Sequence, residues 1–531
     1  MLTKQAVVVG IAWLALAGPA RLIVVAQTSR PAAQTRTTQP ATQTSQPAAL
    51  ASQPVVQPSR PAVQAGWPAA RPNLILILAG DLAGGMAGFE GHPLIRTTNL
   101  DHLAAESVRF TRCYVPTPQD APTRASILTG RYPHVHGVTT DGQALSPRTL
   151  TFTAELKKNG YVCGIVGQWD LPCASAREPG FGLVDYVATD AVDEKNVVAT
   201  NAAQTNVAET NVAEKNVAEK NMKSLAWQGC SVWVQGTKQT ADKYLTDWHG
   251  DRAIEFIEKF QNQPFFLWLS FRAPHEPLAY PPGMDSLYPL EAIDLPATVR
   301  MDPGAWRNRF NQAEPVVAFQ PQTEQTLRQA RAQYYAMITR LDENVGRVLK
   351  RLDELKLRDN TVVVFTSNNG WALGEHRLYG QGPFFYEELV RVPLVVRCPA
   401  LAPSPLKIDR VVSLVDLAPT LCELAGLPEQ LGMQGTSLTA LIRYPETSQH
   451  ADERFFEYDQ QKGKKYPVRG LVTGRYKLID YLQGDGAFYD LALDPKETDN
   501  AIGVAEYATV INVLRSRLEF WRKQTKDLQN K

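Results

Sequence analysis

The chain has 531 residues, with 55 Lys and Arg against 54 Asp and Glu, so its formal net charge is only +1. This balance argues against a nucleic-acid-binding protein that relies on bulk attraction to phosphate. The hydrophobic fraction of 44% is enough for a sizeable core. Six cysteines in so long a chain exclude a disulfide-dense mini-fold, and the absence of an HExxH segment excludes the commonest zinc-protease pattern.

Residues 1–26 have the pattern of a secretory signal peptide. A lysine precedes an apolar run over residues 6–18, and small residues that suit cleavage follow at Ala20 and Ala26. An uncleaved N-terminal anchor is the alternative, because residues 22–26 extend the apolar stretch. Either interpretation predicts a secreted or periplasmic protein with no transmembrane domain beyond such an anchor.

Two segments have the composition of polypeptide that lacks a packed core. Residues 27–70 are rich in Pro, Gln, Ser, Thr and Ala, which predicts a disordered linker. Residues 196–221 repeat units such as NVAEK, with Asn at every fifth position, a period that fits neither a helix face nor a strand face. We interpret this repeat as an insertion in a surface loop. Cys173 and Cys230 flank it and could clamp it, but the sequence leaves all disulfide pairing open.

The main body, residues 71–442, alternates predicted strands with predicted helices. Nearly continuous apolar runs predict buried strands at 73–79, 162–166, 265–271, 361–366 and 393–396. The strongest helical period covers residues 326–355. The alternation predicts an α/β fold with a large, mostly parallel sheet sandwiched by helices.

The remaining residues, 443–531, differ in character from this body. Short strand-like runs lie around 470–479, and an amphipathic helix is predicted near 510–521. We therefore predict a small C-terminal α+β subdomain. In the main sheet, sites form at the carboxyl ends of parallel strands, so the loops after Ala79, Val166, Phe271 and Ser367 should converge.

These loops carry segments by which the chain resembles a known family. The segment PTRASILTGRYPHVHGV, Pro122–Val138, is close to the signature C-x-P-S-R-x-x-x-x-T-G-R, and GYVCGIVGQWDL, FFLWLSFRAPHEPL and VVVFTSNNGWALGEH match further motifs. On these motifs the chain resembles sulfatases of the alkaline-phosphatase-like superfamily. The segments GWALGEH and SLYPLEAIDLP are more similar to the iduronate-sulfatase and choline-sulfatase branch.

The resemblance implies a formylglycine nucleophile made from the first Cys or Ser of the signature. It also implies cationic Lys and His side chains that neutralise the sulfate during hydrolysis. Here the nucleophile position is Asp120, which cannot become formylglycine, and three cationic positions are also substituted. The family's catalytic positions read, in this chain, Asp120, Arg124, Gln168, Asp170, His275 and Gln381. Only Arg124 and His275 match the family.

The resemblance further implies a calcium ion held by two Asp after the first strand and by a later Asp-Asn pair. These metal positions read Gly80, Asp81, Asn368 and Asn369, so Gly80 replaces one ligand and the site is degenerate. We expect no cofactor, although the sequence leaves binding of residual calcium open. The framework motifs are kept while the charged centre is altered, which indicates that the fold persists and the chemistry is lost.

Several local interpretations stay open at this point. Asp120 could be the N-cap of the following helix, a metal ligand beside Asp81 and Asn369, or a nucleophile. Arg124 could pair with Asp120 or Asp81 as a buried charge. His275 could be a satisfied buried histidine or a surviving ligand contact.

Three functions follow from these observations. The first is a catalytically inactive sulfatase-like protein outside the cytoplasm that binds a sulfated or uronic polysaccharide, or a partner sulfatase. The second is an active sulfuric ester hydrolase whose rearranged centre uses Asp81, Asp120 and Asn369 around a metal ion. The third is a structural protein tethered through the linker.

Overall fold

The computed structural model describes residues 71–171, 186–190, 231–235, 237–300, 323–402, 405–428, 432–461, 464–482 and 486–527. The predicted signal peptide, the linker at 27–70, the repeat insertion at 196–221 and the cysteines Cys173 and Cys230 lie outside these residues. The residues described belong to one compact unit. Within them, no helix combines the length and the apolar character needed to cross a membrane.

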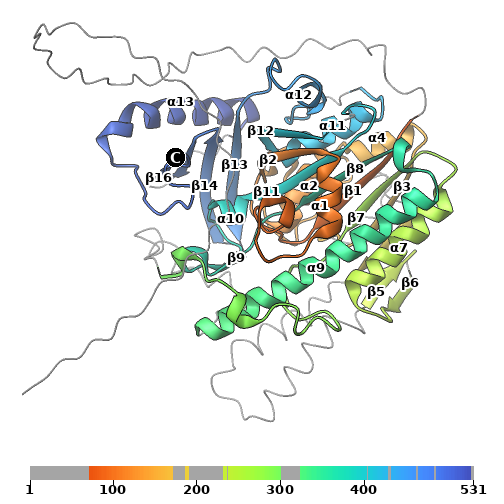
Figure 1. Cartoon of the computed structure of the whole chain (residues 1–531). Coiled ribbons are helices and arrows are strands. Elements are labelled where there is room, and N and C mark those ends of the chain that lie inside the picture. Colours follow the sequence, from red (N-terminus) through yellow and green to blue (C-terminus); the bar gives the residue numbers. More distant parts are fainter. Residues whose placement is uncertain are drawn as a thin grey trace, which may run out of the picture. The chain divides into compact units, whose positions relative to one another are not determined.

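A ten-stranded sheet forms the centre of this unit, in the order β12-β2-β11-β8-β1-β7-β3-β4-β5-β6 (Figure 1). In its middle, β1 pairs in parallel with β7 and β8, and β3 pairs in parallel with β7. The strand bounds are β1 Asn73–Ala79, β2 Val108–Tyr114, β3 Val162–Gly167, β4 Tyr186–Asp190, β5 Ser231–Val234, β6 Thr237–Thr240, β7 Phe265–Ser270, β8 Thr361–Ser367, β11 Arg391–Arg397 and β12 Leu406–Ser413. The predicted mostly parallel sheet is thus confirmed.

One predicted strand runs against the expected direction. Residues 393–396 belong to β11, which pairs antiparallel with both β2 and β8. The register of β11 against β2 shifts between Val392 and Leu394, at Pro393, which has no N–H to donate to the ladder. An apolar run shows that a strand is buried, and it does not show which way the strand runs.

Helices cover both faces of this sheet. Successive side chains of a strand point to opposite faces, and in β1 Leu74 and Leu76 belong to one buried apolar cluster while Ile75 and Ile77 belong to another. Residues of α1, α7 and α9 pack with Ile75, and residues of α2, α4 and α11 pack with Leu74 (Figure 1). The helix bounds are α1 Thr98–Ala105, α2 Asp120–Thr129, α3 Pro133–His136, α4 Phe152–Lys158, α7 Leu245–Phe260, α9 Glu324–Glu354, α10 Glu387–Val390, α11 Leu417–Leu424 and α12 Thr439–Arg443.

The predicted helix at 326–355 is α9, which begins with a capping box between Thr323 and Thr326. Its 31 residues give a length of roughly 46 Å at about 1.5 Å per residue. Its N-terminal half reaches the carboxyl end of the sheet, where Tyr334 donates a hydrogen bond to the backbone oxygen of Asp81 at 2.6 Å. The longest helix among the described residues therefore supports the loop after β1.

The C-terminal part forms a second, four-stranded antiparallel sheet in the order β13-β14-β15-β16. Its elements are β13 Glu453–Gln461, β14 Lys464–Thr473, β15 Tyr476–Tyr481, β16 Gly486–Asp490 and the helix α13 Ala508–Thr525. Buried residues of α13 pack on this sheet around Phe455 and Phe488. A two-stranded ribbon, β9 Ala372–Leu373 with β10 Tyr379–Gly380, precedes Gln381 in the main body. The described cysteines Cys113, Cys163, Cys398 and Cys422 are all buried.

Candidate functional site

The loops after four parallel strands converge at one edge of the main sheet, as the predicted topology requires. Asp81 follows β1, Gln168 and Asp170 follow β3, His275 follows β7, and Asn368 with Asn369 follows β8. The N–H of Asp81 donates to Asn368 Oδ1 at 2.8 Å, which joins the first and last of these loops directly. The helix α2 adds Asp120 and Arg124, and the segment that follows β10 adds Gln381.

A pair of buried carboxylates lies at the centre of this edge. Oxygens of Asp81 and Asp120 lie 3.8 Å and 3.9 Å from Nε2 of His275. One oxygen or nitrogen from each of the three side chains lies within 4.8 Å of the other two, and we call this group the Asp–Asp–His cluster. On the far side of the ring, Nδ1 lies 2.7 Å from the backbone oxygen of Glu276. Because that oxygen can only accept, Nδ1 carries a proton and donates it.

Three side-chain amides donate hydrogen bonds to the two carboxylates. Gln381 Nε2 donates to Asp81 Oδ1 at 2.7 Å and to Asp120 Oδ2 at 3.1 Å. Asn369 Nδ2 donates to Asp81 Oδ1 at 2.6 Å, and Asn368 Nδ2 donates to Asp120 Oδ1. The neutral residues at the former cation and metal positions thus stabilise the acids through hydrogen bonds, without adding positive charge.

Asp120 is not the N-cap of its helix. The N-cap is Gln119, and the N–H of Ala121 donates instead to Asp141 Oδ1 at 2.9 Å. Asp120 is the first helical residue, where its negative charge also suits the positive end of the helix dipole. The N-cap interpretation is therefore wrong, because a residue from the loop after α3 supplies the acceptor and leaves the Asp120 carboxylate to face the site.

Arg124 pairs with Asp170, and the expected pairing with Asp120 or Asp81 is wrong. The Arg124 side chain is fully buried, and its Nε lies 2.8 Å from Asp170 Oδ2. A second donor of the guanidinium contacts Ser270 Oγ at 2.6 Å. The Asp that replaces the family's histidine therefore pairs with Arg124.

Gly80 allows a close approach between the loops after β1 and β7. A Cβ placed on Gly80 would lie 2.5 Å from the backbone oxygen of Arg272 and 3.1 Å from Gln168 Oε1. Side chains do not tolerate a backbone contact below 3.0 Å without movement of the backbone. The N–H of Gly80 also donates to the backbone oxygen of Ala273 at 3.2 Å. The loop after β7 thus occupies the space that the family's first metal-binding Asp would need.

The electrostatics of the Asp–Asp–His cluster favour positive charge at its centre. Burial raises the pKa of Asp81 well above its usual range, and the charge of Asp120 raises it further while that of His275 opposes both. Burial also raises the pKa of Asp120. Burial alone would lower the pKa of His275, but the carboxylates of Asp81 and Asp120 outweigh it and raise that pKa. A proton or another cation between the three groups is therefore stabilised.

The residues present do not fit a calcium site of the kind that the family resemblance implies. Calcium takes about six to eight oxygen ligands. Asp81 Oδ2 and Asn369 Oδ1 are buried and have no hydrogen-bond partner among the described residues, and Asp120 offers a further oxygen. Gly80 offers no side-chain ligand, and Asn368 Oδ1 already accepts the backbone N–H groups of Asp81 and Asn369. The set of protein oxygens falls short of a calcium cage.

Four supporting residues were not predicted. Ser270 contacts Arg124, and Ser367 Oγ accepts the N–H of Leu82 at 2.8 Å. Tyr334 supports the Asp81 backbone, and the Trp371 ring lies 5.9 Å from that of His275. Both serines are the last residues of parallel strands, so the strand-end rule could have found them. Trp371 lies in the quoted segment GWALGEH, but the motif gave it no role, and no sequence pattern marked Tyr334.

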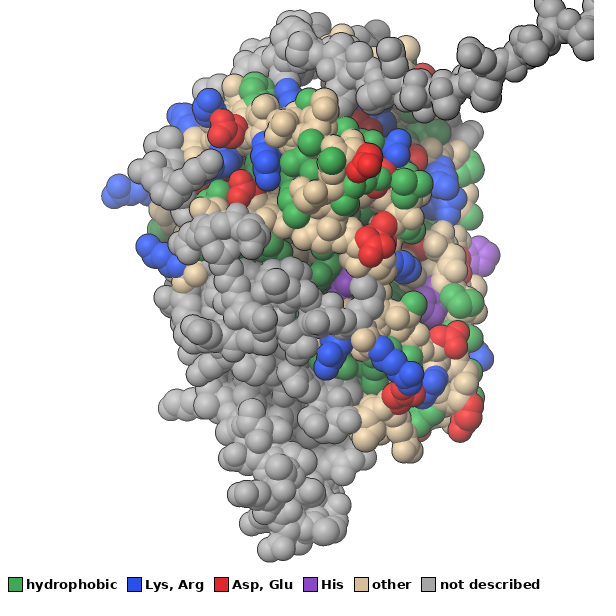
Figure 2. All heavy atoms as spheres, turned by 90° about the vertical axis from the view of Figure 1, so that its left-hand side faces the viewer, with side chains coloured by type: hydrophobic (Ala, Val, Ile, Leu, Met, Phe, Trp, Pro, Cys, Tyr) green, Lys and Arg blue, Asp and Glu red, His purple; other side chains and the backbone are tan. Residues whose placement is uncertain are grey.

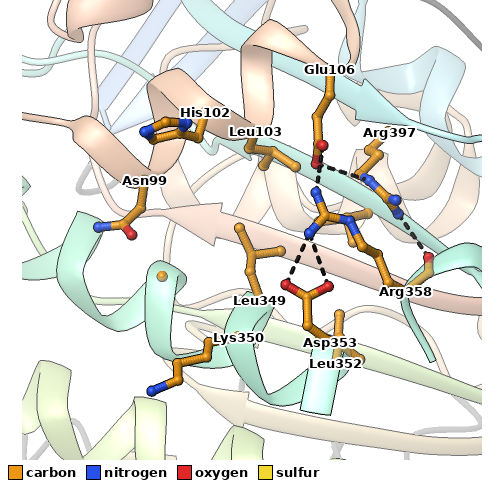
Figure 3. Close-up of a pocket in the computed structure, with 12 residues that line it drawn as sticks. Asn99, His102, Leu103, Glu106, Leu349, Lys350, Leu352, Asp353, Arg358 and Arg397 are labelled. Atoms are coloured by element: carbon orange, nitrogen blue, oxygen red, sulfur yellow. Dashed lines mark hydrogen bonds and ion pairs between the residues drawn. The ribbon is translucent and has the colours of Figure 1, made fainter. Parts of the chain in front are cut away.

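A second cavity, of about 220 Å³, lies between α1 and α9 (Figure 3). Four of its charged side chains pair with one another: Arg397 lies 3.1 Å from Glu106, and Arg358 contacts Glu106 and lies 2.9 Å from Asp353. Arg358 precedes β8, so this cavity adjoins the amino end of that strand, opposite the Asp–Asp–His cluster. The pairing of these charges makes it a weaker candidate for ligand binding.

Comparison with known proteins identifies the family. The pattern described as "Sulfatase" matches residues 72–427, and the C-terminal pattern of N-sulphoglucosamine sulphohydrolase matches residues 374–524. N-acetylglucosamine-6-O-sulfatase of Bacteroides thetaiotaomicron is 26% identical over 86% of this chain and 87% of its own length. Iduronate 2-sulfatase of Mus musculus is 30% identical over 67% of this chain and 69% of its own.

The fold agrees with these matches. A structure solved in complex with the substrate D-glucosamine-2-N,6-O-disulfate has a TM-score of 0.73 at 24% identity, covering 87% of this chain and 99% of that one. The architecture of a large, mostly parallel sheet with a C-terminal antiparallel sheet is therefore shared. The chain belongs to the sulfatase family.

Proposed function

We propose that this chain is a sulfatase-like protein that acts outside the cytoplasm, does not hydrolyse sulfate esters, and binds a sulfated or uronic polysaccharide. The observation that carries the proposal is the environment of Asp120. At the position implied for the nucleophile, its carboxylate accepts hydrogen bonds from Asn368 and Gln381 beside the buried Asp81. A carboxylate there cannot become formylglycine.

Electrostatics support the loss of hydrolysis. A sulfate oxygen about 4 Å from a carboxylate is repelled by about 1–4 kcal/mol per pair of unit charges, depending on screening. Asp81 and Asp120 both contribute this repulsion, and Arg124 is neutralised by Asp170. Gln168 and Gln381 stand where the resemblance implies lysines. A transition state that gathers negative charge would therefore lack the preorganised cations that lower its energy.

Relatives support a sugar ligand. Their names refer to N-acetylglucosamine-6-O-sulfatase, iduronate 2-sulfatase and an ulvan-active sulfatase. The face drawn in Figure 2 shows acidic and basic side chains interspersed over its described part, which is the usual pattern of a solvated surface. The outer loops would recognise the sugar in our proposal, and the signal-peptide pattern of residues 1–26 supports a location outside the cytoplasm.

Isothermal titration calorimetry of the purified full chain tests this function. The panel contains sulfated, desulfated and uronic oligosaccharides of matched length. We expect saturable binding of at least one charged member, with weaker binding of its desulfated counterpart. Flat titrations across the panel would contradict glycan binding, and copurification with an active sulfatase would then identify the partner-binding alternative.

A second candidate, an active hydrolase with a rearranged centre, is favoured by one observation. Asp81, Asp120 and His275 converge closely enough to share an ion. Sustained release of sulfate that stops on addition of a chelator and resumes on return of the metal would establish that function and exclude the first.

A further inference from the structure

Three buried oxygens around the Asp–Asp–His cluster lack hydrogen-bond partners. They are Asp81 Oδ2, Asn369 Oδ1 and Gln168 Oε1, and none finds a donor in the described part of the chain. Asp81 and Asn369 have no exposed surface, and Gln168 is 2% exposed. A buried acceptor without a donor is unfavourable, and the Asp81 and Asn369 side chains already share a hydrogen bond. The orphan oxygens of these two side chains therefore point to a missing positive partner.

His275 presents a nitrogen to the same place. Its Nδ1 donates to the Glu276 backbone oxygen at 2.7 Å, which leaves Nε2 of the neutral ring as a lone-pair donor facing Asp81 and Asp120. Metal-binding histidines typically have this arrangement, in which the second ring nitrogen donates to a carbonyl and fixes the tautomer. The distances of 3.8 and 3.9 Å are too long for hydrogen bonds. They suit ligands that share an ion with bonds of about 2.0–2.2 Å.

The mixture of ligand atoms selects the kind of ion. Calcium and magnesium prefer oxygen ligands, whereas an imidazole nitrogen with carboxylates suits first-row transition ions such as zinc. The Arg272 backbone oxygen would lie 2.5 Å from a Cβ on residue 80, so it closes the position from which the family's first Asp would add an oxygen. The site therefore has too few oxygen ligands for a large ion such as calcium. It keeps a compact set of carboxylate oxygens and one imidazole nitrogen.

We propose that Asp81, Asp120 and His275 bind one first-row divalent transition ion, of the zinc type, in preference to calcium, with Asn369 Oδ1 or water as a further ligand. Such an ion balances the charge of the two carboxylates. It can reach the site because the His275 side chain keeps 17% of its surface exposed. This inference holds whether or not the protein cleaves sulfate esters.

The test uses untagged full-length protein that has been treated with a chelator and dialysed. Calorimetric titrations with zinc, manganese and calcium chloride measure stoichiometry and affinity. We expect one zinc or manganese ion per chain and at least about tenfold weaker binding of calcium. The X-ray absorption spectrum of the zinc-loaded wild type should show nitrogen and oxygen neighbours at about 2.0–2.1 Å with an imidazole contribution. Sulfur neighbours at about 2.3 Å would place zinc on cysteine and overturn the proposal.

Variants assign the ligands. His275→Gln and Asp120→Asn should each weaken zinc binding by more than roughly a hundredfold, since even outer-shell changes cost about 10–100-fold. His102→Gln, on the exposed surface of α1 beside the second cavity, should leave the affinity unchanged. The proposal is overturned if wild type binds no ion, binds calcium as tightly as zinc, or binds zinc equally well in both cluster variants. The wild-type spectrum and selectivity decide the matter even where a variant fails to fold.

Discussion

Restoring the family's first metal-binding aspartate, by Gly80→Asp, should destabilise this protein and leave it without a calcium site. A Cβ at residue 80 would lie 2.5 Å from the Arg272 backbone oxygen, so the loop after β7 must move. If the loop after β7 instead moved at little cost, the new carboxylate would complete the family's acidic pair. The first outcome lowers the free energy of unfolding, and the second leaves it unchanged or raises it in calcium, so stability measurements separate the two.

The expected magnitude follows from two contributions. Forcing extra atoms into a packed position costs about 1–3 kcal/mol. In the metal-free protein the new carboxylate also joins Asp81 and Asp120 without a cation, and leaving a buried charge unpaired costs about 3–5 kcal/mol. Gly80→Asp should therefore lower the free energy of unfolding by about 4–8 kcal/mol, a large part of the about 5–15 kcal/mol typical of natural proteins. Gly80→Ala adds only the Cβ and should cost about 1–3 kcal/mol.

Urea denaturation of the wild type and these variants, with and without calcium, measures both contributions. Gly503→Ala is the matched control: nothing lies within 4 Å of its added Cβ, and we expect a change within about 0.5 kcal/mol. A Gly80→Asp protein as stable as the wild type, or stabilised by calcium above it, would refute the reasoning. Equal costs for the Ala and Asp variants would show that charge contributes nothing.

Other predictions concern single residues or pairs. Asp120→Cys, expressed in a host that forms formylglycine, should not recover sulfate-ester turnover, because the expected cations at positions 168, 170 and 381 and the first metal-binding Asp at position 80 are also absent; turnover would show that the rest of the site is competent. Arg124→Ala and Asp170→Ala should each cost about 3–5 kcal/mol in urea denaturation, and the double variant less than their sum, because each single variant leaves a buried charge unpaired. Burial alone would raise the pKa of Asp527, but hydrogen bonds and charge from Arg469 lower it to about 2. This depressed pKa contributes about 2 kcal/mol above about pH 4, and the contribution disappears as the pH falls towards about 2. Asp527→Asn should therefore lower the free energy of unfolding at pH 7 and reduce its fall between about pH 4 and pH 2. An equal fall in the wild type and the variant would contradict the assignment.

The parallel strands and their meeting point could be predicted because both depend on local pattern. A nearly continuous apolar run such as residues 73–79 must be buried on both faces, and the alternate leucines and isoleucines of β1 do pack into separate clusters. The carboxyl ends of parallel strands then bring Asp81 and Asn368 together whatever the rest of the chain does. The direction of β11 was not predictable in this way, since antiparallel and parallel buried strands have the same apolar pattern.

Individual partners in the site depended on contacts between distant segments. The sequence shows that Arg124 and Asp170 are both present, but it does not show that they lie 2.8 Å apart while Asp120 faces amides. The N-cap interpretation of Asp120 failed because Asp141 bonds the helix start from a separate loop. The substitution to Gly80 was visible in the sequence, but the loop that fills its place was visible only in the structure.

The central claim, that this member of the sulfatase family does not hydrolyse sulfate esters, is tested most directly by released sulfate. Purified full-length protein is incubated with an aryl sulfate and with sulfated disaccharides, with and without zinc or calcium, and inorganic sulfate is quantified by ion chromatography. The account predicts no release above that of an Asp81→Ala, Asp120→Ala double variant. Sustained release of many sulfate ions per protein molecule from any one compound would contradict it.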